Sequence, residues 1–225
     1  MFVINDPQPQ IAPARRTVLL NAEPATIGHF RQTGFMDPAI RALLPDRRIA
    51  GTAVTVRFDG DDTAIVHYAL GKLRPGDILV MDRAGDTRHA CCGGGVAFAA
   101  RAAGCLGIII DGAATDIQEL RAYAMPVWAR GLSPITCKPR FIGGEFCVPI
   151  SCGGVTVAPG DVVFADENGV LVMPPCDIEA SATRAIGMQD AEKVALARVT
   201  KGEKFPDING TNAKIREILA AQAAR

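Results

Sequence analysis

Residues 104–116 read Gly-Cys-Leu-Gly-Ile-Ile-Ile-Asp-Gly-Ala-Ala-Thr-Asp, an apolar run that leads into two aspartates. The unbroken apolar segment from Leu106 to Ile110 predicts a strand that is covered on both faces, as in the central sheet of an α/β protein. The pair Asp111-Gly112 predicts a turn at the carboxyl end of this strand. A carboxylate beside a buried strand needs a hydrogen bond or a cation, so Asp111 and Asp116 both need partners.

Two interpretations of these aspartates stay open at this point. In the first, one carboxylate binds a hard divalent metal ion and the other orients the groups around the ion, which makes Asp116 and Asp111 candidate metal ligands. In the second, Asp111 only shapes the turn, and Asp116 caps a helix predicted over residues 117–123.

A glycine-rich turn forms the second candidate feature. Gly93, Gly94 and Gly95 come directly before a helix of small residues, predicted from Val96 to Ala103. Free backbone N–H groups at the start of a helix suit a carboxylate or a phosphate, so Gly93 to Val96 are candidate substrate-binding residues. The turn is not a P-loop, because the Lys-Ser/Thr pair is missing. The alternative is that the glycines merely allow a helix and a strand to pack closely.

The charge balance excludes some classes of function. Lys plus Arg and Asp plus Glu number 24 each, so no overall field attracts nucleic acid or an anionic membrane. The longest apolar stretches fall short of the roughly 18 residues that a membrane span needs, and the amino terminus lacks the pattern of a signal peptide. We therefore expect a cytoplasmic protein with a small-molecule ligand.

The cysteines indicate neither disulfides nor a zinc site. There are seven of them, and no pair has CxxC spacing. We expect most of them to be small apolar fillers of the core. A nucleophilic pair at Cys91-Cys92 beside His89 is the alternative, although no spacing signature supports it.

The order of predicted elements indicates one α/β domain with a helical tail. We expect an N-terminal arm over residues 1–16, a catalytic-type domain over 17–176, and a helical tail over 177–225 that packs on the body or on a neighbouring subunit. Helices are predicted at 38–44 and 62–70. Strands are predicted at 50–57, 78–82, 126–130, 146–150, 155–157, 162–165 and 170–173.

Three segments in order carry a resemblance to a known family. They are residues 107–116, the run Pro-Val-Trp-Ala-Arg-Gly at 126–131, and the run Val-Ala-Pro-Gly-Asp-Val-Val-Phe-Ala-Asp-Glu-Asn-Gly-Val at 157–170. Over about residues 25 to 205 the chain resembles the class II, metal-dependent aldolases that act on 4-hydroxy-4-methyl-2-oxoglutarate and 4-carboxy-4-hydroxy-2-oxoadipate. The regulators of ribonuclease activity of the A type belong to the same superfamily.

The resemblance implies a layered β/β/α sandwich like the swivelling phosphohistidine domain, assembled as a homotrimer or homohexamer with sites between subunits. It also implies a divalent ion, Mg²⁺ or Mn²⁺, that is anchored by Asp116 largely through water. The amides of Gly93 to Val96 would hold the carboxylate of a 2-oxo acid, and an arginine just before the aspartate would support the substrate oxygens. C–C cleavage would then leave a metal-stabilised pyruvate enolate.

The sequence departs from the family pattern at two positions. The aldolases read Arg-Asp where this chain has Thr115-Asp116, and they carry Gly-Glu or Gly-Asp where it has Gly93-Gly94. The first change removes a fixed cation, and the second removes a candidate base or water-orienting acid.

Other residues of the chain could compensate for these losses. His89, Arg83 or Arg88 could supply a cation or a proton, although each is equally an ordinary surface or core group. In the tail, Glu192 or Glu203 could supply the acid, although charge on a helix surface is the more common role. We take Asp116, Thr115 and His89 as the candidate catalytic residues.

These observations predict a divalent-metal-dependent carbon–carbon lyase, an aldolase or a 2-oxo acid decarboxylase, with an atypical small substrate. Decarboxylation needs only the stabilised enolate, so it could survive the two changes better than aldol cleavage. The alternative is a non-catalytic regulator or binding protein like the ribonuclease regulators. A different metal-dependent reaction on a less anionic substrate is a third possibility, since Thr115 replaces a charge with a neutral hydroxyl.

Overall fold

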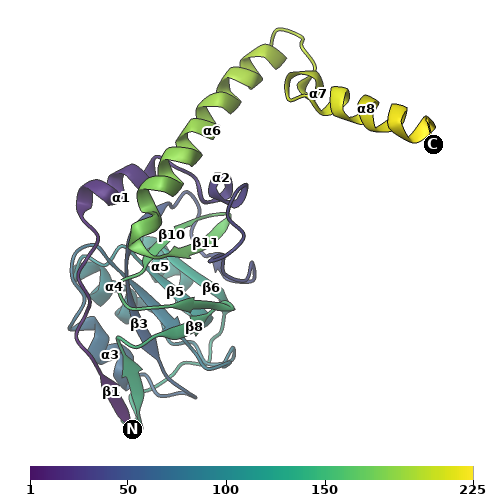
Figure 1. The fold of residues 1–225 in the computed structure, drawn as a ribbon. Helices are drawn as coiled ribbons and strands as arrows, with labels where there is room; N and C mark the ends of the chain where they lie inside the picture. Colours follow the sequence, from purple (N-terminus) through teal and green to yellow (C-terminus); the bar gives the residue numbers. More distant parts are fainter. Residues whose placement is uncertain (225) are drawn as a thin grey trace.

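The computed structural model describes residues 1–224, and a nine-stranded mixed sheet forms its centre (Figure 1). The strands are β1 (Phe2–Ile4), β2 (Arg41–Ala42), β3 (Ile49–Arg57), β4 (Asp77–Asp82), β5 (Gly107–Ala114), β6 (Val127–Leu132), β7 (Gly144–Phe146), β8 (Ile150–Cys152), β9 (Val155–Val157), β10 (Val162–Asp166) and β11 (Gly169–Met173). The helices are α1 (Pro13–Leu20), α2 (Pro24–Gly28), α3 (Ala64–Leu70), α4 (Gly94–Ala102), α5 (Ile117–Ala122), α6 (Ile178–Val199), α7 (Phe205–Ile208) and α8 (Thr211–Ala223), with a short 3₁₀ turn at Pro175–Asp177.

Strands β3, β4, β5 and β6 are parallel neighbours at the centre of the sheet. Their apolar residues are buried on both faces, as the unbroken Ile run of β5 predicts. Parallel strands need crossover connections, and here α3, α4 and α5 provide them. The carboxyl ends of β4, β5 and β6 therefore lie at one edge, where ligand sites of α/β proteins form.

The turn predicted at Asp111-Gly112 is wrong. Strand β5 continues to Ala114, and its register against β6 shifts between Ile110 and Ala113. A bulge at this place keeps the chain paired while it re-aims the side chains that follow. Asp111 is consequently a strand residue.

Helices cover one face of the sheet and β-hairpins cover the other. Val54, Ile108 and Leu120 belong to the core between the sheet and the layer of α3, α4 and α5. On the opposite face, Ile109 and Trp128 pack with side chains of β8, β9, β10 and β11. The predicted α/β class and the β/β/α layering are confirmed.

Trp128 anchors the hairpin layer to the sheet. Its side chain is fully buried, and its indole N–H donates a hydrogen bond of 2.8 Å to the carbonyl of Asp166 at the end of β10. A buried indole N–H without an acceptor would be costly, so this bond fixes the position of β10 over β6.

The N-terminal segment is attached to the body at two places. Strand β1 pairs in parallel with the edge strand β7, and α1 already begins at Pro13 and packs against α6. The helix predicted at 38–44 is wrong, because the segment forms turns and the short strand β2, which pairs with β6. The carboxylate of Asp37 accepts the N–H of Ala39 at 2.9 Å, a local bond that competes with helix formation.

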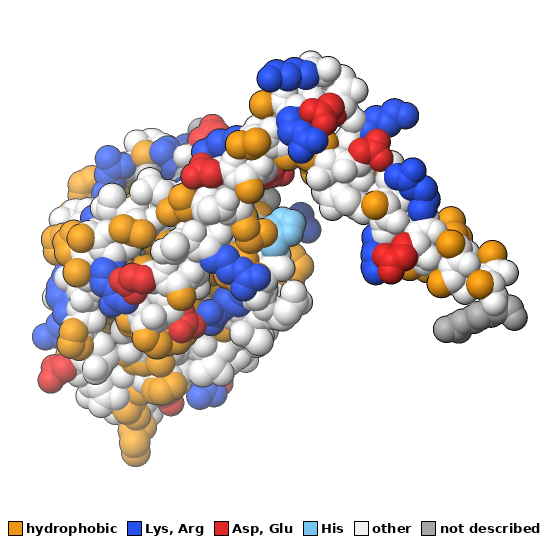
Figure 2. Space-filling model, turned by 45° about the horizontal axis from the view of Figure 1, so that its top comes forward, with side chains coloured by type: hydrophobic (Ala, Val, Ile, Leu, Met, Phe, Trp, Pro, Cys, Tyr) orange, Lys and Arg blue, Asp and Glu red, His pale blue; other side chains and the backbone are white. Residues whose placement is uncertain are grey.

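The C-terminal tail is helical, as expected. Only the first part of α6 is buried, through Ile178, Ser181, Ala182 and Ala185, and α8 buries no residue. Figure 1 shows α7 and α8 projecting away from the body. In the space-filling view of Figure 2, apolar and charged side chains alternate along this projection. Within residues 1–224, no helix combines the length and the apolar character that crossing a membrane requires.

Candidate functional site

The glycine turn and Asp116 meet because one short segment bridges the ends of two strands. The backbone N–H of Cys91 donates to the carbonyl of Ala113 at 3.2 Å, and the backbone N–H of Thr115 donates to the carbonyl of Cys92 at 2.8 Å. On the other side of the segment, the N–H of Ala90 reaches the carbonyl of Ile135 at 2.8 Å. Residues 90–92 thus lie between the chain that follows β5 and the chain that follows β6, and they deliver Gly93 to Thr115 and Asp116.

Asp116 has an unusual backbone conformation. Its φ of 54° and ψ of 44° lie in the left-handed region, which costs a residue other than glycine about 1 kcal/mol. Asp116 occupies the N-cap position of α5, but its side chain makes no capping hydrogen bond to the helix, so the carboxylate is not a helix cap. One carboxylate oxygen, Oδ2, instead accepts the N–H of Gly94 at 3.0 Å, and the Thr115 hydroxyl lies 3.3 Å from the other. Strain of this kind is often found at functional sites.

The start of α4 presents backbone donors beside this carboxylate. Asp116 takes the N–H of Gly94, whereas those of Gly95 and Val96 have no acceptor within residues 1–224. A Cβ placed on Gly93 would lie only 2.3 Å from Oδ2 of Asp116, so the close approach requires glycine at that position. The turn does more than allow packing, because it holds the aspartate and leaves two donors open.

Asp116 and Thr115 lie between two hollows of the surface. One, of about 370 Å³, is lined by Thr63, His67, Leu70, Ala90, Cys91, Gly93, Gly95, Val96, Ala99, Thr115, Asp116, Thr136 and Cys137. We call it the loop cavity. The other, of about 430 Å³, is lined by Thr115, Asp116, Ile117, Gln118, Glu119, Leu132, Ser133 and Pro134. Among residues 1–224, no Lys or Arg lines either hollow.

Sequence analysis did not identify His67, an exposed residue of α3 that lines the loop cavity. No motif surrounds it in the sequence. Its place follows only from the packing of α3 beside α4.

Asp111 has a different environment. Its carboxylate forms an ion pair with Arg130 and accepts the N–H of Gly153 at 2.7 Å. Arg130 also binds Asp37 at 2.9 Å, so the three side chains link β5, β6 and the loop before β2. Asp111 lines neither hollow beside Asp116. The structure does not bring the two aspartates together, and we keep only Asp116 as a candidate metal ligand.

His89 also has a partner away from the loop cavity. Its Nδ1 lies 2.7 Å from Oδ2 of Asp86, which also binds the guanidinium of Arg83 at 3.1 Å. Burial opposes ionisation of Asp86, but hydrogen bonds from the backbone and ring of His89 leave the pKa of this carboxyl below its usual value. His89, the buried Arg83 and the exposed Arg88 line neither hollow, so they do not replace the arginine missing at Thr115.

The seven cysteines form no disulfide within residues 1–224, and most of them are buried. Burial raises the pKa of the Cys91 thiol to about 12 and that of Cys92 well above its ordinary value. A thiol that stays protonated is a poor nucleophile, so the Cys91-Cys92 pair is a filler of the core.

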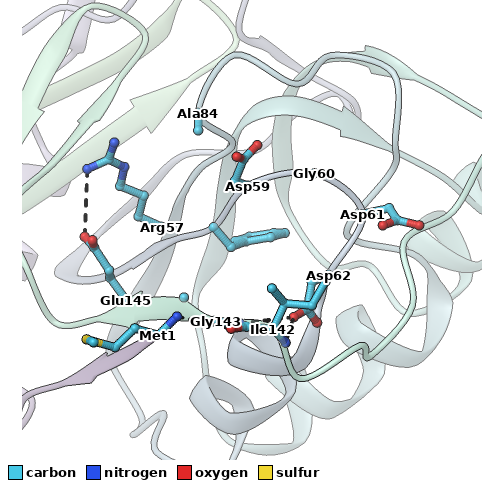
Figure 3. A pocket seen from close by; sticks show the side chains of 12 residues that line it. Met1, Arg57, Asp59, Gly60, Asp61, Asp62, Ala84, Ile142, Gly143 and Glu145 are labelled. Carbon is cyan, nitrogen blue, oxygen red and sulfur yellow. Dashed lines mark hydrogen bonds and ion pairs between the residues drawn. The ribbon is translucent and has the colours of Figure 1, made fainter.

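A larger hollow, of about 510 Å³, lies at the far end of β3 and contains none of the predicted site residues (Figure 3). Most of its carboxylates are already bound: Glu145 faces Arg57, Asp61 pairs with Arg140, and Asp62 accepts backbone N–H groups. We therefore place the candidate site at the loop cavity.

The residues of the loop cavity fit a water-rich divalent ion. Asp116 presents an exposed carboxylate, with the Thr115 hydroxyl beside it. Mg²⁺ is commonly bound through one or two carboxylates while it keeps several waters. Within residues 1–224 no group of three or more His, Cys, Asp or Glu side chains is placed to hold an ion, so the donor set suits Mg²⁺ or Mn²⁺ better than Zn²⁺.

Comparisons with known proteins identify the family of the chain. A family profile described as RraA-like, Aldolase/RraA, matches residues 19–172. The chain belongs to the RraA-like family. A protein of Halalkalibacterium halodurans that is named as a candidate 4-hydroxy-4-methyl-2-oxoglutarate aldolase is 37% identical over 135 residues. That match covers 60% of this chain and 64% of the relative, which is less than two thirds of its length.

Solved structures of RraA-like proteins share the fold. Streptomyces coelicolor RraAS2, described as an unusual member of the RNase ES inhibitor RraA protein family, aligns with a TM-score of 0.75 at 25% identity. The alignment covers 84% of this chain and 98% of that one. An uncharacterised protein from Pseudomonas syringae pv. tomato aligns with a TM-score of 0.78 over 94% of this chain and 99% of that one. Its identity of 24% shows the fold alone.

Proposed function

We propose that this RraA-like chain is a divalent-metal-dependent carbon–carbon lyase, an aldolase or a 2-oxo acid decarboxylase, acting on a small 2-oxo acid. One observation carries the proposal. The exposed Asp116 carboxylate is held, at the cost of backbone strain, beside the open N-terminus of α4, and both border the loop cavity. The similarity to a candidate aldolase supports the same chemistry.

Different residues of the chain would bind the substrate anion and the metal cation. The N–H groups of Gly95 and Val96 lie at the positive end of the α4 dipole, so they would hold the carboxylate of the substrate. Asp116 would hold a divalent ion, and the Thr115 hydroxyl keeps its carboxylate oriented. When bound, Mg²⁺ or Mn²⁺ would supply the positive charge that stabilises a pyruvate-type enolate after C–C cleavage.

Thr115 and the missing cations point to an atypical substrate. No Lys or Arg of the described residues lines either hollow beside Asp116, so a second carboxylate on the substrate would find no charged partner among them. We propose that the preferred substrate carries less negative charge than the usual dicarboxylates. His67 also lines the loop cavity, and we propose that its imidazole exchanges a proton with the substrate.

The test is pyruvate release from oxaloacetate and from 4-carboxy-4-hydroxy-2-oxoadipate, with Mg²⁺ or Mn²⁺, with chelator, and against a metal-only blank. We expect metal-dependent turnover that falls by about 100-fold or more in Asp116→Asn, since asparagine tolerates the left-handed backbone but loses the charge. Asp190→Asn, which changes an exposed carboxylate on α6, is the matched control and should keep full activity. No turnover on either substrate with either metal would exclude both compounds as substrates and would favour a less anionic substrate or a binding role.

A non-catalytic binding role is the second candidate. The absence of a cation beside Asp116 favours it, as does the similarity to a protein described as a member of an RNase inhibitor family. In that case the surface of the assembly would act and the loop cavity would be residual.

We also propose that the chain assembles as a homotrimer or homohexamer. Large apolar side chains are exposed along the projecting tail: Val194, Leu196, Phe205, Ile215, Ile218 and Leu219. Exposed apolar surface of this kind is typical of contacts between subunits.

A further inference from the structure

A second carboxylate reaches the glycine turn from helix α5. A Cβ placed on Gly94 would lie 1.3 Å from Oε2 of Glu119 and 2.5 Å from its Cδ. The Glu119 carboxylate therefore occupies the place that a side chain on residue 94 would take. Since a Cβ on Gly93 would meet Asp116 in the same way, two carboxylates lie against two consecutive glycines.

The Glu119 carboxylate has no partner in the protein. No hydrogen bond or ion pair to it is found within residues 1–224, although Arg121 belongs to the same helix. Glu119 lines the same hollow as Thr115 and Asp116, and it is exposed to solvent. Like charges that are held against the same turn repel each other, and a cation between or beside them would remove that repulsion.

We propose that Glu119 supplies the second carboxylate of the metal site. This carboxylate lies where the side chain of a residue other than glycine at position 94 would lie. The inference rests on the proposed function. Asp116 and Glu119 together provide oxygen donors from two elements, which is the carboxylate number that a hydrated Mg²⁺ or Mn²⁺ commonly uses. The arrangement is consistent with glycine at position 94, since a Cβ there would displace the Glu119 carboxylate.

This assignment replaces the tail residues as the source of the acid. Glu203 is already bound to Arg198 at 2.6 Å. Glu192 lines a separate groove between α6 and α7, together with His29 and Phe205. Glu119 needs no movement of the chain to reach Gly94.

The first test is direct Mn²⁺ binding to the full chain, measured by the free-Mn²⁺ signal in electron paramagnetic resonance. Glu119→Gln keeps the shape of the side chain and removes its charge, so we expect the Mn²⁺ dissociation constant to rise about 10- to 100-fold. Glu192→Gln is the matched control, because it removes the same charge from an exposed helix residue that lines neither hollow beside Asp116. Its affinity should equal that of the wild type.

The second test moves the carboxylate back to the turn. In Gly94→Asp/Glu119→Ala the new aspartate enters the space that the glutamate leaves, whereas Gly94→Asp alone displaces the Glu119 carboxylate. We expect the double variant to recover Mn²⁺ affinity that Glu119→Ala loses, with unchanged circular dichroism. If Glu119→Ala loses Mn²⁺ affinity and the double variant does not recover it, the proposal is overturned. A carboxylate at this position would then not be what binds the ion.

The outcomes separate this inference from the proposed function. If wild type binds Mn²⁺ and Glu119→Gln binds it equally well, Glu119 is not part of the site and the lyase proposal stands. If Glu192→Gln weakens binding instead, the acid comes from the tail and this inference is refuted. If Glu119→Gln weakens Mn²⁺ binding but wild type releases no pyruvate, the two-carboxylate site holds and the lyase proposal fails.

Discussion

Replacing Asp62 by asparagine should remove a pH-dependent part of the stability. The carboxylate is buried and accepts four backbone N–H groups: from Ala64 at 2.9 Å, Arg140 at 2.8 Å, Ile142 at 2.7 Å and Gly143 at 3.4 Å. These bonds tie the loop before β7 to the start of α3. Burial alone would raise the pKa of Asp62, but the four donors outweigh it and lower the pKa from 3.8 to about 2.

The size of the effect follows from this change in pKa. One pKa unit corresponds to about 1.4 kcal/mol, so the lowered value contributes about 2 kcal/mol to the free energy of unfolding. Because the pKa is lower in the folded state, this contribution is fully present above the unfolded value of 3.8 and is lost as the pH falls toward 2. Asparagine cannot ionise, so Asp62→Asn should lack this dependence.

Urea unfolding at pH 7 and at pH 3, at one protein concentration, measures both quantities. We expect Asp62→Asn to lower the free energy of unfolding by about 2 kcal/mol at pH 7 but by only about 1 kcal/mol at pH 3. Asp59→Asn, which changes an exposed carboxyl in the same loop, should have little effect at either pH. An Asp62→Asn deficit that is equal at both pH values would refute the argument, since the stabilisation would then not depend on the charge.

Two further predictions concern residues that the sequence left open. Asp111→Asn should destabilise the fold by about 1 to 3 kcal/mol, because it breaks the contact with Arg130, yet leave Mn²⁺ affinity unchanged; a large loss of affinity would return Asp111 to the metal site. With a thiol reagent at pH 8, Cys176 should react fast and the buried cysteines only after unfolding, so Cys176→Ser should remove the fast phase. A second fast thiol at Cys91 or Cys92 would contradict the raised pKa of both groups.

The fold could be predicted from the sequence wherever a segment's own pattern decides its structure. The Ile-rich run of β5 and the small-residue helix α4 form close to the predicted bounds. The pattern failed at Asp111 and at 38–44, where partners distant in the sequence contribute to the outcome, although at 38–44 the local bond from Ala39 to Asp37 also opposes a helix. Arg130 binds Asp111 and Asp37 at once, and no local signal announces that bond.

The candidate site was predictable in part for the same reason. Asp116 and the glycine turn carry signals of their own, and the structure joins them through the Gly94 N–H. His67 and Glu119 carry none, because each is an ordinary polar residue on a short helix until the packing of α3, α4 and α5 brings it to the turn. Conversely, His89 looked informative beside two cysteines, but Asp86 accounts for it.

The single tryptophan makes the unfolding of this molecule separable by spectroscopy. Trp128 is buried between the sheet and the hairpin layer, far along the chain from the exposed helices α7 and α8. Its emission therefore reports only on the β layers, whereas far-ultraviolet circular dichroism also follows the projecting helices. If the two signals change at different denaturant concentrations, the tail melts independently of the body, and a single unfolding free energy does not describe the chain.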